Sequence, residues 1–241
     1  VVLLPELSRA LRGGQLREAS NIQNRSVEFV LFLTLPAAAA IWVLSDEIIR
    51  VVYEHGAFDP STTATVAGIL AIYGLGLPGF VLIKAFNPGF FAREDTKTPM
   101  RFTMISVAVN CALAISLFPF FAERGIATAE AVAGWITMAL LFATLVRRGH
   151  FEVERALLSR LARLIVAALI MAAALEYASA YTAPYIRPTS SIFEQVGAVL
   201  ALIALAMVVY FGVAFAIGGA SLGMIRRNIK RGGATPAAAD Q

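Results

Sequence analysis

Six apolar runs, each roughly long enough to cross a membrane, constrain this chain more than any other feature of its sequence. An α-helix needs about 20 mostly apolar residues to span the hydrocarbon core of a bilayer. Strands of a membrane β-barrel would instead alternate apolar and polar residues over segments of about ten residues. We therefore predict an all-α fold, a polytopic transmembrane helical bundle with about six membrane-spanning helices. The runs cover residues 27–44, 61–83, 104–122, 126–146, 164–180 and 196–217.

The composition agrees with a membrane protein and argues against a nucleic-acid partner. Hydrophobic residues make up 59% of the chain and charged residues 15%, whereas soluble domains carry about 25% charged residues. The net charge is +4 and the pI is about 9.5, which in a soluble protein would suggest nucleic-acid binding. Here the basic residues lie between the apolar runs, so they are better explained by orientation against a membrane.

The basic residues occupy every second connector between the runs. All 20 except Arg50, Arg124 and Arg187 lie before the first run, between the second and third, between the fourth and fifth, or after the sixth. Basic connectors stay on the cytoplasmic side, so both ends of the chain are predicted to be cytoplasmic. The predicted organisation is a helix end and interfacial segment (1–26), four membrane helices (27–148), a basic connector (149–163), two further membrane helices (164–220) and a basic tail expected to be disordered (221–241).

Local signals predict where helices begin and bend. Asp59-Pro60 and Thr98-Pro99 each read as an N-cap followed by proline in the first turn. Pro78, with three glycines close to it, predicts a kink or an unwound turn around residues 74–79. The opening residues read as the last turn of a helix whose beginning is missing, so we expect a fragment of a longer protein.

Catalytic chemistry is not indicated. The single cysteine, Cys111, lies within an apolar run and reads as a packing residue, while His55 and His150 lie in connectors without metal-ligand spacing. Motifs such as HExxH, the P-loop or GxSxG do not occur. We predict a protein that is not an enzyme, with no metal site and no cofactor.

Ionisable residues near the apolar runs are the candidates for function, because burying a charge in lipid is costly. Glu28 follows Arg25 by three residues, so one helical face can hold both, either as an interfacial ion pair or as part of a polar cavity. Lys84 either extends to the cytoplasmic interface or faces the same cavity. Arg25, Glu28 and Lys84 are therefore the substrate or cavity candidates, whereas Glu130 and Glu176 are expected at the interface.

One long motif resembles a known family. The run from Lys84 to Pro99, KAFNPGFFAREDTKTP, is close to the pattern K-x-L-x-P-x-F-[YF]-A-[RS]-x-D-T-[KR]-T-P of the MurJ/MviN lipid II flippases, within the multidrug, oligosaccharide-lipid and polysaccharide exporter group. Residues 3–9 and 52–58 resemble two shorter family segments, and weaker similarity extends along the rest of the chain.

The resemblance implies a place in a larger transporter. The family has fourteen helices in two six-helix lobes plus two extra helices, and this chain would supply the last six, with residues 164–180 and 196–217 lining a groove for the lipid tail. The implied function is to move the undecaprenyl-pyrophosphate-linked peptidoglycan precursor, lipid II, outward across the bacterial inner membrane by alternating access. The implied partners are lipid II, membrane lipids and a missing N-terminal lobe of the same chain. The family's cavity arginines would lie upstream of Val1.

The same motif predicts a structural role for the connector that it covers. We expect a tight turn in which Arg93, Asp95, Thr98 and Pro99, together with the bend at Pro78, hold two helices as one unit. Asp95 would accept bonds from backbone N–H groups or pair with Arg93 or Lys97. Two alternative functions stay open: an exporter of another lipid-linked polysaccharide or of a drug, and a membrane scaffold for cell-wall synthesis that transports nothing.

Overall fold

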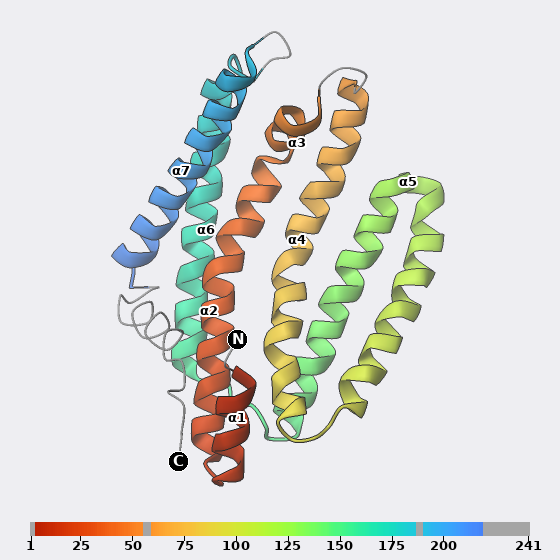
Figure 1. Ribbon diagram of the computed structural model, residues 1–241, viewed down its shortest axis with the longest axis vertical. Coiled ribbons are helices and arrows are strands. Elements are labelled where there is room, and N and C mark those ends of the chain that lie inside the picture. The colour runs from red at the N-terminus through yellow and green to blue at the C-terminus, as the bar shows by residue number, and fades with distance from the viewer. Residues whose placement is uncertain (1–2, 55–58, 187–189, 219–241) are drawn as a thin grey trace, which may run out of the picture.

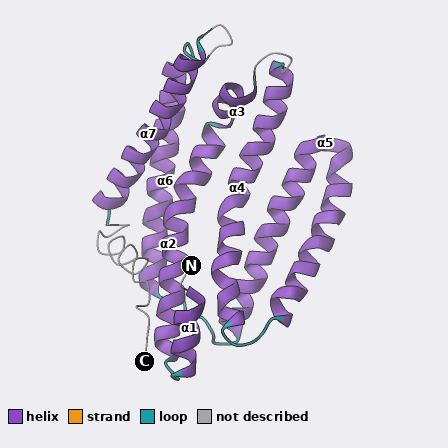
Figure 2. Cartoon of the chain, viewed as in Figure 1, coloured by secondary structure: helices purple, strands orange, loops and turns teal. Residues whose placement is uncertain are grey.

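The computed structural model describes residues 3–54, 59–186 and 190–218, and within these ranges the ordered elements are all α-helices (Figures 1 and 2). This confirms the predicted all-α class. The connector residue His55 and the tail at 221–241, which is expected to be disordered, lie outside the described residues. The helices are α1 (Leu3–Arg12), α2 (Leu16–Val43), α3 (Ser45–Tyr53), α4 (Pro60–Phe91), α5 (Lys97–Arg147), α6 (Arg155–Thr182) and α7 (Ile192–Ala216).

Five of the described helices, α2 and α4 to α7, are long and apolar enough to cross a membrane. The longest of them, α5, contains two of the predicted spans. As a straight rod its 51 residues would extend about 77 Å, more than twice the thickness of the hydrocarbon core. The chain instead reverses at Ala122, where φ is 47° and ψ is −128°, and α5 forms two arms side by side (Figure 1). Ser106 on the first arm donates to the carbonyl of Ala133 on the second arm, at 3.3 Å.

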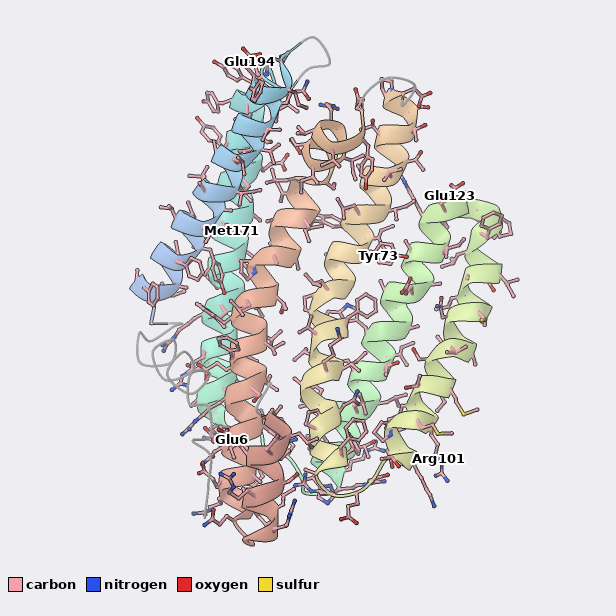
Figure 3. The ribbon with its side chains drawn as sticks, in the orientation of Figure 1. Glu6, Tyr73, Arg101, Glu123, Met171 and Glu194 are labelled. Carbon is pink, nitrogen blue, oxygen red and sulfur yellow. The ribbon has the colours of Figure 1, made fainter. Side chains whose placement is uncertain are left out.

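The reversal of α5 is tight because Gly125 has no side chain. A Cβ at this position would lie 2.9 Å from the backbone carbonyl carbon and oxygen of Leu117, closer than real Cβ atoms come. Glu123 lies at this turn and Arg101 at the far end of the first arm (Figure 3).

The helices follow one another as neighbours in the order α7, α6, α2, α4 and α5 (Figure 1). Two buried clusters share the central helix α2. One joins α2 to α6 and α7 around Phe32, Met171 and Tyr210, and the other joins α2 to α4 and the second arm of α5 around Phe86 and Leu141. The two clusters place α2 in the middle of the molecule.

Two short helices, which flank α2, mark the two ends of the bundle. α1 turns back onto α2 through Gly13 and Gly14 and buries Leu7 against Ala19. α3 was not predicted; it continues from α2 after a break at Leu44 and lies at the other end (Figure 1). We call the end that holds α1, the α4–α5 turn and the α5–α6 connector the basic end, and the end that holds α3 and the α5 reversal the opposite end.

The prediction for α4 was correct at its start, whereas of the kink or unwound turn predicted at its centre the unwound turn was wrong. Asp59 caps the helix, accepting a 2.8 Å bond from the backbone N–H of Thr62, with Pro60 in the first turn. Around Pro78, however, α4 continues as α-helix, so the predicted unwound turn is not present in this described segment. Pro78 removes the helical donor of the Gly74 carbonyl. One residue further along, the indole Nε1 of Trp135 donates to the carbonyl of Leu75 at 3.0 Å.

A second proline, Pro36 in α2, is accommodated by a bond from a neighbouring helix. Pro36 has no N–H, so it leaves the carbonyl of Phe32, four residues earlier, without its helical donor. The hydroxyl of Tyr210 on α7 donates to that carbonyl at 2.8 Å. A neighbouring helix thus satisfies the carbonyl that Pro36 frees, which is the condition for proline in a membrane helix.

Candidate functional site

A groove of about 730 Å³ opens beside α2, between α4 and α6. Its walls are apolar and include Leu35 of α2, Pro78 of α4, Trp135 of α5 and Leu169 of α6. Among the lining residues, all of them in the described part of the chain, Glu176 is the one ionisable side chain. The volume lies in the range of pockets that hold small organic ligands, and the apolar walls suit a hydrocarbon chain.

The groove exists because α4 and α6 do not pack directly on one another along their described lengths. α4 packs on α2 and α5, whereas α6 packs on α2 and α7, so α2 alone separates them. The lining residues on α6 run from Leu161 to Glu176, which at the rise of an α-helix is about 22 Å. The groove is therefore long enough to follow most of the hydrocarbon depth of a bilayer.

An ion pair lies beyond the last apolar residues at the basic end of the groove. Glu28, one turn before the lining residue Leu31, is buried, with 5% of its side chain exposed. Arg160, next to the lining residue Leu161, donates from Nη1 to both carboxylate oxygens of Glu28, at 2.8 and 3.0 Å. The low exposure of Glu28 means that the pair is shielded on one side, while the half-exposed guanidinium stays in contact with the surroundings.

The three candidate cavity residues from the sequence are not brought together. The predicted partner of Glu28 was Arg25, but the structure pairs Glu28 with Arg160, and Arg25 is exposed. Lys84 is also exposed, and it lies nine residues from the lining residue Leu75, which places it on the opposite face of α4. Of the three, only Glu28 lies next to the groove.

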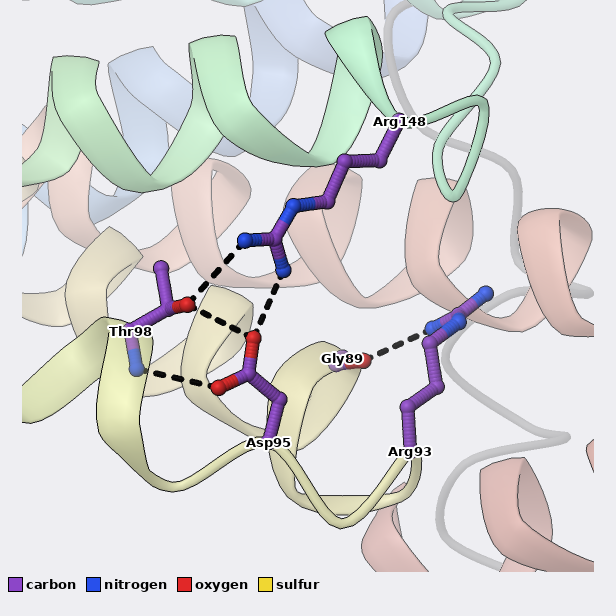
Figure 4. Close-up of polar contacts among 5 residues, drawn as sticks. All are labelled: Gly89, Arg93, Asp95, Thr98 and Arg148. Atoms are coloured by element: carbon purple, nitrogen blue, oxygen red, sulfur yellow. Dashed lines mark hydrogen bonds and ion pairs between the residues drawn. The ribbon is translucent and has the colours of Figure 1, made fainter.

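The predicted tight turn between α4 and α5 is present, and Asp95 organises it (Figure 4). Its carboxylate accepts from the backbone N–H of Thr98 at 3.0 Å and from the Thr98 hydroxyl at 2.6 Å. These bonds, and the Arg148 guanidinium beside it, lower the pKa of Asp95 to about 2. Arg93 reaches back to the carbonyl of Gly89 at 2.7 Å and closes the turn on the other side.

Two details of this turn differ from the prediction. The helix begins at Lys97 with Thr96 as its N-cap residue, so Thr98 lies inside the first turn and is not the cap, and Pro99 follows it. The cationic partner of Asp95 is Arg148 at 2.6 Å, not Arg93 or Lys97. Arg148 is 53 residues away, at the end of the second arm of α5, so the pair joins the two arms at the basic end.

The connector between α5 and α6 is fixed to α2 by residues that the sequence analysis did not identify. The backbone N–H and carbonyl of Glu152 bond to the hydroxyl of Ser20, and the Asn24 amide donates to the same carbonyl at 2.8 Å. Phe151 is buried against Phe86. Ser20 and Asn24 lie four residues apart on one buried face of α2, and this spacing of polar residues could have indicated a shared partner. The partner could not be identified from the sequence, because it is more than 125 residues away.

The comparisons with known proteins agree on one family. The family model described as "Lipid II flippase MurJ" matches residues 1–197. A "Probable lipid II flippase MurJ" from Rhizobium tropici is 59% identical over 98% of this chain and 44% of its own length, and one from Rhizobium meliloti is 62% identical over 96% and 43%. A solved structure titled "Lipid II flippase MurJ, inward closed conformation" matches with a TM-score of 0.69 and 25% identity, over 96% of this chain and 44% of its own. The chain thus spans less than half the length of these relatives.

Proposed function

The chain belongs to the MurJ lipid II flippase family, and we propose that it forms the C-terminal part of a protein that moves lipid II outward across the bacterial inner membrane by alternating access. The observation that supports this best is the apolar groove beside α2, because a lipid-linked substrate needs an apolar place for its tail. The anionic head group needs a polar cavity, which we place between this part and an N-terminal lobe of the same protein.

The orientation is proposed from charge. The basic end holds Arg93, Arg148 and Arg155, and charge of this sign is retained on the cytoplasmic side. The opposite end, with α3 and the α5 reversal, would then face outward, with both ends of the fragment in the cytoplasm. Movement of a lipid between leaflets makes and breaks no covalent bond, so we propose no enzymatic activity.

We propose different roles for the three cavity candidates, Arg25, Glu28 and Lys84. Glu28 is proposed to act with Arg160 as a polar boundary at the cytoplasmic end of the tail groove, since the pair lies next to Leu31 and Leu161. Arg25 and Lys84, both exposed, are proposed to face the head-group cavity or the lobe that completes it. Replacing each by glutamine in the full-length protein, with Arg101→Gln as an exposed basic control, would measure their importance for growth.

The tail groove is tested by filling it. Ala172 lines the groove on α6, and Ala162 is an exposed alanine on the same helix that does not line it. In the full-length protein, Ala172→Trp is expected to abolish complementation of a strain depleted of the wild-type protein and to cause lipid II precursor to accumulate. Ala162→Trp is expected to complement the strain without accumulation of precursor. Equal growth of the two variants at equal protein level would refute the groove as the tail site. Growth failure without precursor accumulation would favour the scaffold alternative.

The α4–α5 turn is proposed to keep the two helices moving as one unit. The ion pair of Asp95 with Arg148 connects the end of α4 with both ends of α5. Pro78, in the groove wall, is proposed to set the shape of the part of α4 that lies further from this turn. Asp95→Ala should then reduce flipping while the protein still inserts. Glu94→Ala is the matched control, because it removes the same charge from the same turn and Glu94 is exposed. Normal growth with Asp95→Ala would refute the role of the turn.

A further inference from the structure

Arg124 is a fixed cation at the opposite end of the bundle. It follows the reversal of α5 at Ala122, and its Nη2 donates to the carbonyl of Ala64 on α4 at 2.7 Å. The residue is exposed, and within the described part of the chain its guanidinium makes this one hydrogen bond, so the other N–H groups remain available.

A notch in α4 holds this guanidinium. Gly68 lies one turn beyond Ala64, and a Cβ at Gly68 would lie 2.5 Å from Nε and 2.6 Å from Cζ of Arg124. Any larger residue would push the guanidinium away from α4. The atoms that a Cβ would meet belong to the end of a flexible side chain, so the helix itself would not have to move.

The charge of Arg124 is not neutralised by a carboxylate within ion-pair distance in the described residues. The two acidic residues nearest to Arg124 in the sequence form no ion pair with it. Glu130 accepts a 2.8 Å hydrogen bond from the Tyr73 hydroxyl, and Glu123 is the exposed residue that precedes Arg124 at the turn. Across the bundle at the same end, Arg50 pairs with Glu54 at 3.4 Å. Arg124 is therefore the described cation at this end that is held in place without a counter-ion.

Arg124 stands in line with the tail groove. On α4, Gly68 and the groove residue Leu75 are seven residues apart, so they share one face and are separated by about 10 Å along the axis. On α5, Arg124 and the groove residue Trp135 are eleven residues apart, which again is one face. The guanidinium thus lies about two to three helical turns beyond these groove residues, where the polar group of a lipid would lie if its tail occupied the groove.

We propose that Arg124 binds the phosphate of a lipid whose tail lies in the groove, in the outward-facing half of the protein. A guanidinium presents paired N–H donors that match phosphate oxygens, and one held in place loses little conformational freedom on binding. This deepens the proposed function and rests on its tail site. The phosphate comes either from the transported pyrophosphate lipid or from a membrane phospholipid, and the chemistry of recognition is shared.

The test compares lipid binding by full-length protein in detergent, measured by native mass spectrometry. The probes are undecaprenyl pyrophosphate, phosphatidylglycerol and undecaprenol, which has the same tail without phosphate. Arg124→Gln is expected to weaken binding of the phosphate lipids about tenfold, the loss of one charge-assisted contact, and to leave undecaprenol unchanged. Gly68→Ala keeps the charge and moves the guanidinium, so it should weaken the same lipids.

Arg50→Gln is the control, since it removes an arginine from the same end whose charge is already paired. A loss confined to the pyrophosphate lipid identifies the substrate as the ligand, and a loss for phosphatidylglycerol as well identifies a phospholipid site. Unchanged binding of both phosphate lipids in Arg124→Gln overturns the proposal. The tail site is judged separately: if Ala172→Trp binds undecaprenol as well as wild type, the groove proposal fails whatever Arg124 does.

Discussion

Removing the hydroxyl of Tyr210 is expected to destabilise the protein through α2, not through α7 where Tyr210 resides. Tyr210 is 1% exposed, and its hydroxyl is the donor to the Phe32 carbonyl that Pro36 leaves without a helical partner. Tyr210→Phe keeps the ring and its packing against Phe32, at a centroid distance of 5.8 Å, and removes only the donor.

The size of the effect follows from what the carbonyl loses. A buried acceptor left without a donor costs about 1–3 kcal/mol in proteins generally. Side-chain hydrogen bonds between membrane helices average lower, about 0.6 kcal/mol with a maximum near 1.7. Because the Phe32 carbonyl has no replacement donor in its own helix, we expect a value near the upper end, about 1.5 kcal/mol.

A second substitution tests the cause. Pro36→Ala restores a backbone N–H at the position that normally bonds to the Phe32 carbonyl. In a Pro36→Ala background, Tyr210→Phe should therefore cost about 0.5 kcal/mol or less, since the carbonyl then has a donor. The four proteins of this double-mutant cycle would be compared as full-length chains in detergent, by their unfolding free energies in a denaturant titration.

The reasoning fails if the cost of Tyr210→Phe is the same in the wild-type and in the Pro36→Ala background. That result would mean that the hydroxyl contributes only its own contact between α7 and α2. Phe211→Leu in the same two backgrounds serves as the control, because this neighbour also contacts Phe32 but through its ring alone, so its cost should not depend on the substitution of Pro36.

Three further predictions follow from the ion pairs and the topology. The pKa of Asp95 in the folded protein, about 2, lies below its ordinary value of 3.8. The contribution of Asp95 to stability is therefore complete above about pH 4 and is lost as the pH falls towards 2. The melting temperature of the wild type should fall more steeply over this range than that of Asp95→Ala. Arg160→Ala leaves the Glu28 carboxylate buried without its partner and should cost about 3 kcal/mol, whereas Glu28→Gln combined with Arg160→Ala should recover much of that loss. In a Cys111→Ala background, cysteines at Glu123 and Arg155 should react with an impermeant thiol reagent from opposite sides of the membrane; labelling of both from one side would contradict the orientation.

Sequence periodicity and composition were sufficient for the architecture. Six apolar runs predicted the spans, and the reversal of α5 at Ala122 accounts for the two runs that share one helix. The cap at Asp59 and the turn at Asp95 were also predictable, because both depend on a side chain bonding to a backbone group three residues away. Such signals are local, and local chemistry is what a sequence displays directly.

Only the tertiary structure decided which distant residues meet. Glu28 pairs with Arg160 rather than with nearby Arg25, and Asp95 with Arg148 rather than with Arg93 or Lys97, since helix packing brings together residues 53 to 132 positions apart. The same packing satisfies a group that the local sequence leaves open, since Tyr210 from α7 donates to the Phe32 carbonyl that Pro36 frees in α2. Sequence determined where helices form, and contacts between helices determined which charges are paired and where the groove opens.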